Sequence, residues 1–189
     1  LDQRNAADVE RVAEQMLDTF DGVDAVIANA GININGLAYS MKDDDWSAVI
    51  DTNLSGSFYV CRAFLSELVG QRSGRIVLMS SITAGGASGQ AAYAASKAGL
   101  QGLAKSLAKE YGPKGVTTNV VVPGYFDTAL TRGEGMANSL KDFAALYCPQ
   151  RRLGELSELA ATVLFVCSEG AGFINGAVIP VTGGLGWAP

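Results

Sequence analysis

Tyr93 and Lys97 stand four residues apart in the run Tyr-Ala-Ala-Ser-Lys, and their types and spacing suit proton transfer. Positions i and i+4 lie on one face of a helix, so the Lys97 ammonium could approach the Tyr93 phenol. A free tyrosine has a pKa of about 10, and a nearby positive charge lowers that pKa and favours the phenolate. The hydroxyl of Ser81, at the end of a strand-forming run, could complete the site. The alternative is an ordinary helix start in which the two residues have no chemical relation.

The composition leaves few other routes for proton transfer. The sequence contains no histidine, which excludes Ser-His-Asp triads, Cys-His pairs and His-ligated zinc, and we expect no metal site. The three cysteines, Cys61, Cys148 and Cys167, form no Cys-x-x-Cys pair, and we expect free thiols in a reducing cytoplasm. Tyr93 with Lys97 is therefore the obvious candidate pair for acid–base chemistry.

Length, polarity and charge narrow the class of protein. The 189 residues, 48% hydrophobic and 17% charged, are enough for one globular domain with a sizeable core. The net charge of -5, without a basic stripe, argues against a nucleic-acid partner. No apolar run approaches the roughly 18 residues that a membrane span needs, so we expect no membrane segment.

Apolar periodicity predicts alternating helices and strands. Helical spacing covers residues 6–20, 43–69, 91–111 and 157–167, and short apolar runs cover residues 24–29, 75–80, 116–122 and 177–181. We expect residues 125–152 to be less regular, with short helical pieces. The strand runs are continuous rather than alternating, as in strands that are buried on both faces. The pattern predicts an α/β fold with a doubly wound parallel sheet in a single domain, 1–189.

Three of the predicted strands end in chemically distinctive residues, namely Asn29, Ala30 and Gly31, then Ser80 and Ser81, then Pro123 and Gly124. Ligands of parallel sheets bind beyond the carboxyl ends of the strands. Tyr93 begins just past the second of these ends. We therefore expect one rim of the sheet to gather all three strand ends with Tyr93 and Lys97.

Taken together, these segments resemble the short-chain dehydrogenase/reductase family over essentially the whole chain. The resemblance rests on the motifs above, on Asn53 in the run Thr-Asn-Leu, and on Thr128 after Pro123 and Gly124. Within this family, the sequence as a whole most resembles 3-oxoacyl-(acyl carrier protein) reductases and polyol or sugar dehydrogenases. The resemblance implies a Rossmann-like fold and an NAD- or NADP-dependent oxidoreductase that interconverts a ketone and a secondary alcohol. It also implies a small-molecule carbonyl or alcohol substrate and a homo-oligomer, either a dimer or a tetramer.

The resemblance implies a role for each catalytic position. Tyr93 would be the general acid/base, and Lys97 would lower its pKa and hydrogen-bond the nicotinamide ribose. Ser81 would stabilise the substrate oxygen, although it could instead cap the strand exit, and Ser80 is the rival serine. Asn53 would hold a water in a proton relay, or it could be only a hydrogen-bonded polar residue within a helix.

Cofactor contacts are implied at further positions. Asn29, with Ala30 and Gly31, would brace the sheet beside the adenosine. Pro123 and Gly124 would let the backbone approach the nicotinamide. The remaining contacts would come from Thr128, at the carboxamide or a phosphate, and from Asp2, near the adenine. The substrate would rest against residues 125–152.

The resemblance also implies that this chain is partial. The Thr-Gly-x-x-x-Gly-x-Gly turn that opens a complete family member does not occur in residues 1–189. We therefore expect the sheet to lack its first strands, and the segment that selects NAD or NADP to lie outside this chain. We also expect residues 1–189 alone to bind NAD(P)H weakly. The alternative function is a non-catalytic scaffold of this fold, or an inactive truncated fragment.

Overall fold

A four-stranded parallel sheet forms the centre of the protein. The computed structural model describes residues 1–126 and 136–186. The strands are β1 (Ala25–Ala28), β2 (Gly74–Met79), β3 (Val116–Pro123) and β4 (Val178–Val181), and they lie side by side in that order. Their register pairs Ala28 with Leu78, Met79 with Val121, and Pro123 with Val181, so the carboxyl ends of the strands share one edge.

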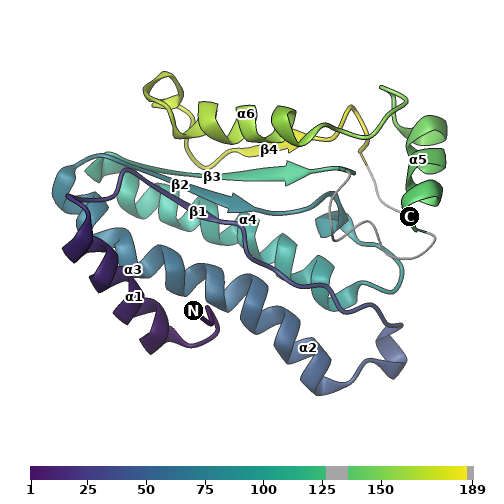
Figure 1. Cartoon of the computed structure of the whole chain (residues 1–189), viewed down its shortest axis with the longest axis horizontal. Coiled ribbons are helices and arrows are strands. Elements are labelled where there is room, and N and C mark those ends of the chain that lie inside the picture. Colours follow the sequence, from purple (N-terminus) through teal and green to yellow (C-terminus); the bar gives the residue numbers. More distant parts are fainter. Residues whose placement is uncertain (127–135, 187–189) are drawn as a thin grey trace.

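Helices cover both faces of this sheet. On one face lie α1 (Ala6–Thr19), α2 (Asp43–Ile50), α3 (Gly56–Gln71) and α4 (Ala91–Tyr111), and on the other lies α6 (Leu156–Cys167) (Figure 1). Helix α5 (Met136–Tyr147) stands beyond the carboxyl ends of the strands (Figure 1). The predicted doubly wound α/β fold is confirmed. In the part of the chain that the structure describes, no helix combines the length and apolar character needed to span a membrane.

Burial on both faces of the sheet explains why the sequences of the central strands are continuous apolar runs. The face toward α3 and α4 buries a cluster that includes Leu68, Ile76, Leu78, Leu100 and Val120. The face toward α6 buries a smaller cluster of Val77, Met79, Val121 and Val166. Successive side chains of β2 and β3 thus enter opposite clusters, so the side chains on both faces of these strands are removed from water.

One predicted helix is interrupted. Residues 43–69 were expected to form a continuous helix, but a π-helical turn at Asp51–Ser55 separates α2 from α3. The fully buried Asn53 lies in this turn, and its side chain bonds the backbone of Ile32 instead of facing solvent. Such single π turns are frequent at functional sites, because they re-aim a side chain within a helix.

Candidate active site

The three predicted strand ends meet around one cavity of about 570 Å³. Helix α4 begins beside them and carries Tyr93 and Lys97 in its first two turns. The predicted residues that line the cavity are Asn29, Gly31, Ser80, Ser81, Tyr93, Lys97, Pro123 and Gly124. The expectation of a single rim is therefore confirmed, and the rim is hollowed.

Lys97 is buried at the floor of this cavity. Its Nζ donates a hydrogen bond to the Met79 carbonyl at 2.7 Å, and the residue is 4% exposed. Burial disfavours the ammonium and lowers the pKa of Lys97 to about 8. The ammonium lies over the face of the Tyr93 ring, 5.6 Å from the ring centroid.

The pKa of Tyr93 departs from expectation. The sequence predicted a lowered pKa because of Lys97, but burial raises the pKa of the phenol above its ordinary value. A hydrogen bond with Ser81 acts in the opposite direction and offsets only part of this shift. The expected direction was wrong because removal from water favours the neutral phenol, and spacing along the sequence does not report burial.

The two adjacent serines differ in their partners. Ser80 Oγ donates to the backbone carbonyl of Lys97 at 2.8 Å and is buried, so it fastens the end of β2 to α4. Ser81 Oγ instead accepts hydrogen bonds from Thr83, and its hydroxyl offsets part of the rise in the Tyr93 pKa. Ser81 also caps the 3-10 turn Ile82–Gly85, so both of its predicted roles occur in the same side chain.

Asn53 lies behind the cavity wall rather than on it. Its Oδ1 accepts from the Ile32 N–H at 2.8 Å, and its Nδ2 donates to the Ile32 carbonyl at 2.9 Å and to Ser96 Oγ at 3.0 Å. Both amide hydrogens are thus used within the protein. Ser96 in turn donates to the Tyr93 carbonyl at 2.7 Å, which links the π turn to the first turn of α4.

Glycines are required where backbones approach each other closely. A Cβ on Gly31 would lie 3.0 Å from Asn53 Oδ1 and 3.3 Å from Lys97 Nζ. A Cβ on Gly124 would lie 2.9 Å from Thr182 Cα, so this glycine allows β3 to exit against the end of β4. Gly31 therefore keeps open the space beside the ammonium, and Gly124 serves packing within the sheet edge.

The remaining predicted cofactor residues lie elsewhere. Ala30 does not line the cavity, and its carbonyl accepts from Gln3 Nε2 at 3.2 Å. Asp2 is also outside the cavity, and its carboxylate pairs with Arg4 at 2.6 Å, which holds the pKa of Asp2 at about 2. Thr128 lies outside the described residues.

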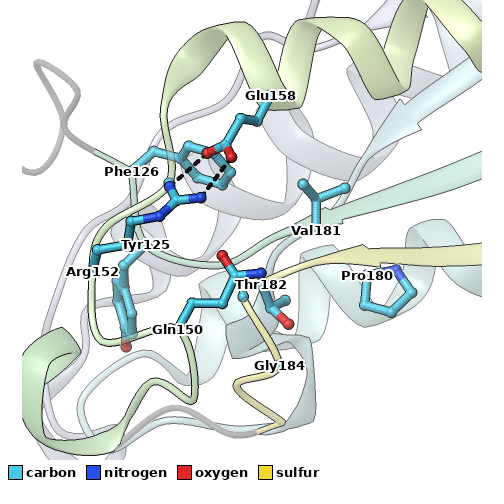
Figure 2. A pocket seen from close by; sticks show the side chains of 11 residues that line it. Tyr125, Phe126, Gln150, Arg152, Glu158, Pro180, Val181, Thr182 and Gly184 are labelled. Atoms are coloured by element: carbon cyan, nitrogen blue, oxygen red, sulfur yellow. Dashed lines mark hydrogen bonds and ion pairs between the residues drawn. The ribbon is translucent and has the colours of Figure 1, made fainter.

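A second pocket of about 420 Å³ lies behind two aromatic residues that also line the first, Tyr125 and Phe126. On its wall, Arg152 and Glu158 are joined by paired hydrogen bonds, at 2.7 and 2.6 Å (Figure 2). Glu158 also accepts from the Glu155 N–H in a capping box that begins α6. The ion pair therefore ties the chain before α6 to that helix, and it supports the Phe126 wall.

Known proteins resemble this chain in sequence and in backbone. Residues 1–186 match the family model described as "Enoyl-(Acyl carrier protein) reductase". The chain belongs to the short-chain dehydrogenase/reductase family. This short-chain dehydrogenase/reductase is 39% identical over 186 residues to the 3-oxoacyl-(acyl-carrier-protein) reductase FabG of Salmonella typhimurium, covering 98% of this chain and 75% of that protein. FabG of Escherichia coli K12 is 38% identical with the same coverage.

A solved relative has nearly the same backbone. The gluconate 5-dehydrogenase from Burkholderia cenocepacia J2315, in complex with NADP and tartrate, has a TM-score of 0.93 and 28% identity. The match covers 98% of this chain and 73% of that one. This short-chain dehydrogenase/reductase is an NAD(P)-dependent oxidoreductase that interconverts a ketone and a secondary alcohol.

The cavity residues of this short-chain dehydrogenase/reductase fit the nicotinamide end of NAD or NADP. An ammonium has three hydrogens, and in the described part of the chain Lys97 uses one of them, on the Met79 carbonyl. The absent side chain of Gly31 leaves room beside the other two. A buried ammonium with hydrogens to spare suits the hydroxyls of a ribose.

Several residues at the site were missed from the sequence. Thr83 and Ser96 hold Ser81, Asn53 and the Tyr93 backbone through their hydroxyls. Their spacing along the sequence could have revealed them. Thr83 follows Ser81 by two residues and Ser96 follows Tyr93 by three, and serine and threonine side chains often form hydrogen bonds at such short separations. Gln3 was also missed, because its bonds to Ala30 and Thr52 span 27 and 49 residues.

Proposed function

We propose that this protein reduces a 3-oxoacyl thioester to the 3-hydroxyacyl form with NADPH or NADH. The observation that carries the proposal is the apolar lining of Phe126, Leu140 and Leu159 in the cavity that also holds Tyr93 and the other polar groups. An acyl chain can lie against such a wall while its 3-oxo group reaches the phenol. The 39% identity to a protein named 3-oxoacyl-(acyl-carrier-protein) reductase supports this choice of substrate.

In the proposed reaction Tyr93 donates its phenolic proton to the carbonyl oxygen during reduction, and it accepts a proton from the alcohol in the reverse direction. Its raised pKa keeps the phenol protonated at neutral pH, as the donor role requires. Ser81 stabilises the charge that develops on the substrate oxygen. When bound, the nicotinamide cofactor supplies or accepts the hydride.

Lys97 and Asn53 support this chemistry in different ways. The Lys97 ammonium stabilises the phenolate that remains after proton transfer, and it bonds the nicotinamide ribose. Asn53 is a positioning residue, because its amide holds the Ile32 backbone and Ser96. A water bound in a relay toward Lys97 would have to use the second lone pair of Asn53 Oδ1 or a backbone atom, since both amide hydrogens are engaged.

The remaining cofactor contacts are proposed by family resemblance. They comprise Asn29, Ala30 and Gly31 at the β1 exit beside the adenosine, Pro123 and Gly124 at the nicotinamide, Thr128 at the carboxamide or a phosphate, and Asp2 near the adenine. Asn29, Gly31, Pro123 and Gly124 line the cavity, which supports their part of the proposal.

A second candidate function is the oxidation of a polyol or sugar. Two side-chain oxygens on the cavity wall, Asn33 Oδ1 and Gln90 Oε1, are buried without a hydrogen-bond partner among the described residues. Hydroxyl donors of a sugar would satisfy such acceptors, and a site with unpaired polar groups discriminates against substrates that lack the matching group. The solved gluconate 5-dehydrogenase is a relative of this type.

Turnover of a substrate panel by the wild type and by Tyr93→Phe tests the proposal. NADPH oxidation would be followed with a 3-oxoacyl thioester, a hydroxylated ketone and a plain ketone. We expect the thioester to have the highest kcat/KM and Tyr93→Phe to lose at least ~100-fold in kcat, as for loss of a general acid. Preference for the hydroxylated ketone would favour the second candidate. Undiminished turnover by Tyr93→Phe would refute the assigned chemistry.

The proposal also includes a homo-oligomer in the cytoplasm. Trp46 of α2 and Phe58 of α3 are 42% and 36% exposed, and large apolar side chains of this kind are typical of subunit interfaces. All three cysteines are free, which suits a reducing compartment. Light scattering coupled to size exclusion would distinguish a monomer from a dimer or a tetramer.

A further inference from the structure

Thr83 makes an unusual pair of contacts with Ser81. The Thr83 N–H donates to Ser81 Oγ at 3.2 Å, and the Thr83 hydroxyl donates to the same oxygen at 2.9 Å. Thr83 is 7% exposed and is held in the 3-10 turn Ile82–Gly85, which fixes both of its donors. Both contacts therefore fall on the serine that lines the cavity together with Tyr93.

The two bonds from Thr83 limit the hydrogen-bonding role that remains to the Ser81 hydroxyl. A serine hydroxyl has one hydrogen to donate and two lone pairs that accept. The backbone N–H of Thr83 can only donate, so it occupies one lone pair, and the Thr83 hydroxyl occupies the other. The Ser81 hydrogen is then the group left for the contact with Tyr93 and the cavity.

We propose that Thr83 is a positioning residue that fixes Ser81 as a hydrogen-bond donor toward Tyr93 and the substrate oxygen. A donor is what the reaction needs there, because negative charge develops on the substrate oxygen and then rests on the Tyr93 phenolate. A hydroxyl that itself accepts a hydrogen bond is also a stronger donor, since linked hydrogen bonds polarise one another. Without the Thr83 hydroxyl, Ser81 is free to rotate its hydrogen away from the phenol.

This inference rests on the proposed roles of Ser81 and Tyr93. It adds that the direction of the Ser81 hydroxyl is set by its neighbour and not by the substrate. The sequence places the two residues close enough for such a bond, because serine and threonine side chains commonly bond groups two residues away.

The test compares Thr83→Val, which keeps the branched shape and the backbone N–H, with Thr83→Ser, which keeps the hydroxyl. We expect Thr83→Val to lose about 3- to 10-fold in kcat, as for loss of one hydrogen bond, with KM and NADPH affinity within about twofold of wild type. In the oxidative direction Tyr93 must be deprotonated, so the limb on which the rate rises with pH should move up by about half a pH unit, because the phenolate loses stabilisation. Thr83→Ser should restore both quantities. Thr162→Val removes another threonine hydroxyl bond, on α6, and serves as the matched control.

Two comparisons make the outcome decisive. In a Ser81→Ala background, Thr83→Val should have no further effect on kcat, since its action passes through Ser81. An equal loss in that background, equal defects in Thr83→Val and Thr83→Ser, or an unchanged kcat and pH profile in Thr83→Val would each overturn the inference. If Ser81→Ala itself keeps full turnover, the assigned role of Ser81 fails instead.

Discussion

The Ser80 hydroxyl donates a hydrogen bond to the backbone carbonyl of Lys97, with 2.8 Å between the two oxygens. This bond joins the end of β2 to α4 at the level of the buried lysine. It also occupies the Ser80 hydrogen, so that Ser81 is the serine of the pair whose hydroxyl acts on the pKa of Tyr93. Two adjacent and chemically identical residues therefore have different tasks, one in stability and the other in proposed catalysis.

Substitution of each serine by alanine should separate these tasks. We expect Ser80→Ala to lower the free energy of unfolding by ~1 kcal/mol, because one buried hydrogen bond is lost. Ser81→Ala should instead lower kcat by about 100- to 1000-fold, as for loss of an oxyanion donor. Urea unfolding and NADPH oxidation measure the two effects. A larger loss of kcat in Ser80→Ala than in Ser81→Ala would contradict the assignment.

Lys97 should give the stability of the cofactor-free protein a distinct pH dependence. Burial lowers its pKa from 10.5 to about 8, so between these values the folded state binds fewer protons than the unfolded chain. Stability then rises with pH through this window, and below pH 8 the buried ammonium is destabilising. A shift of this size corresponds to ~3 kcal/mol.

The measurement compares wild type with Lys97→Met by urea unfolding from pH 7 to 10.5. We expect Lys97→Met to be the more stable at pH 7 and its advantage to shrink as the pH rises past 8. Lys105→Met removes an exposed lysine from the same helix and serves as the control. A stability difference that stays constant over the whole range would show that Lys97 does not carry a burial penalty.

Replacement of Gly31 by alanine, the smallest possible side chain, should already impair cofactor binding. An alanine there would put its Cβ 3.0 Å from Asn53 Oδ1 and 3.3 Å from Lys97 Nζ, which is tighter than an ordinary contact. We expect Gly31→Ala to raise the KM for NADPH at least ~5-fold, because the methyl occupies the space beside the ammonium. Gly36→Ala, in the same loop but with no atom within 4 Å of its Cβ, should leave kinetics unchanged. Equal KM values for the two variants would remove the assigned role of Gly31.

Asn53 should couple the π turn to catalysis. Asn53→Ala removes three hydrogen bonds, two to the part-buried backbone of Ile32 and one to the buried Ser96 hydroxyl, which should cost ~2–4 kcal/mol of unfolding free energy and also lower kcat. Asn119→Ala is the matched control, since Asn119 is equally buried and bonds Ile174 and Ala177 away from the cavity. We expect a similar loss of stability there with unchanged kcat per folded molecule. Loss of kcat in both variants would mean that Asn53 acts only through global stability.

Local pattern determined much of this protein. The bounds of α4 agree with the predicted helix, and the strands fall within a residue or two of their apolar runs, because periodicity reflects which faces of an element leave water. The Tyr93 and Lys97 pair and the three strand ends were also visible in the sequence. Parallel strands bring their carboxyl ends to one edge, so their assembly around one cavity could be predicted.

Tertiary structure decided what depends on partners distant in sequence. The π turn at Asn53 forms because its amide bonds Ile32, and the choice between Ser80 and Ser81 follows from how α4 packs on β2. The direction of the Tyr93 pKa shift was predicted wrongly from the nearby charge, since burial is a property of the whole fold. The sequence by itself determined which groups meet at the rim. Only the packed structure decided which of them face the cavity, which are occupied in holding it together, and how far burial changes their protonation.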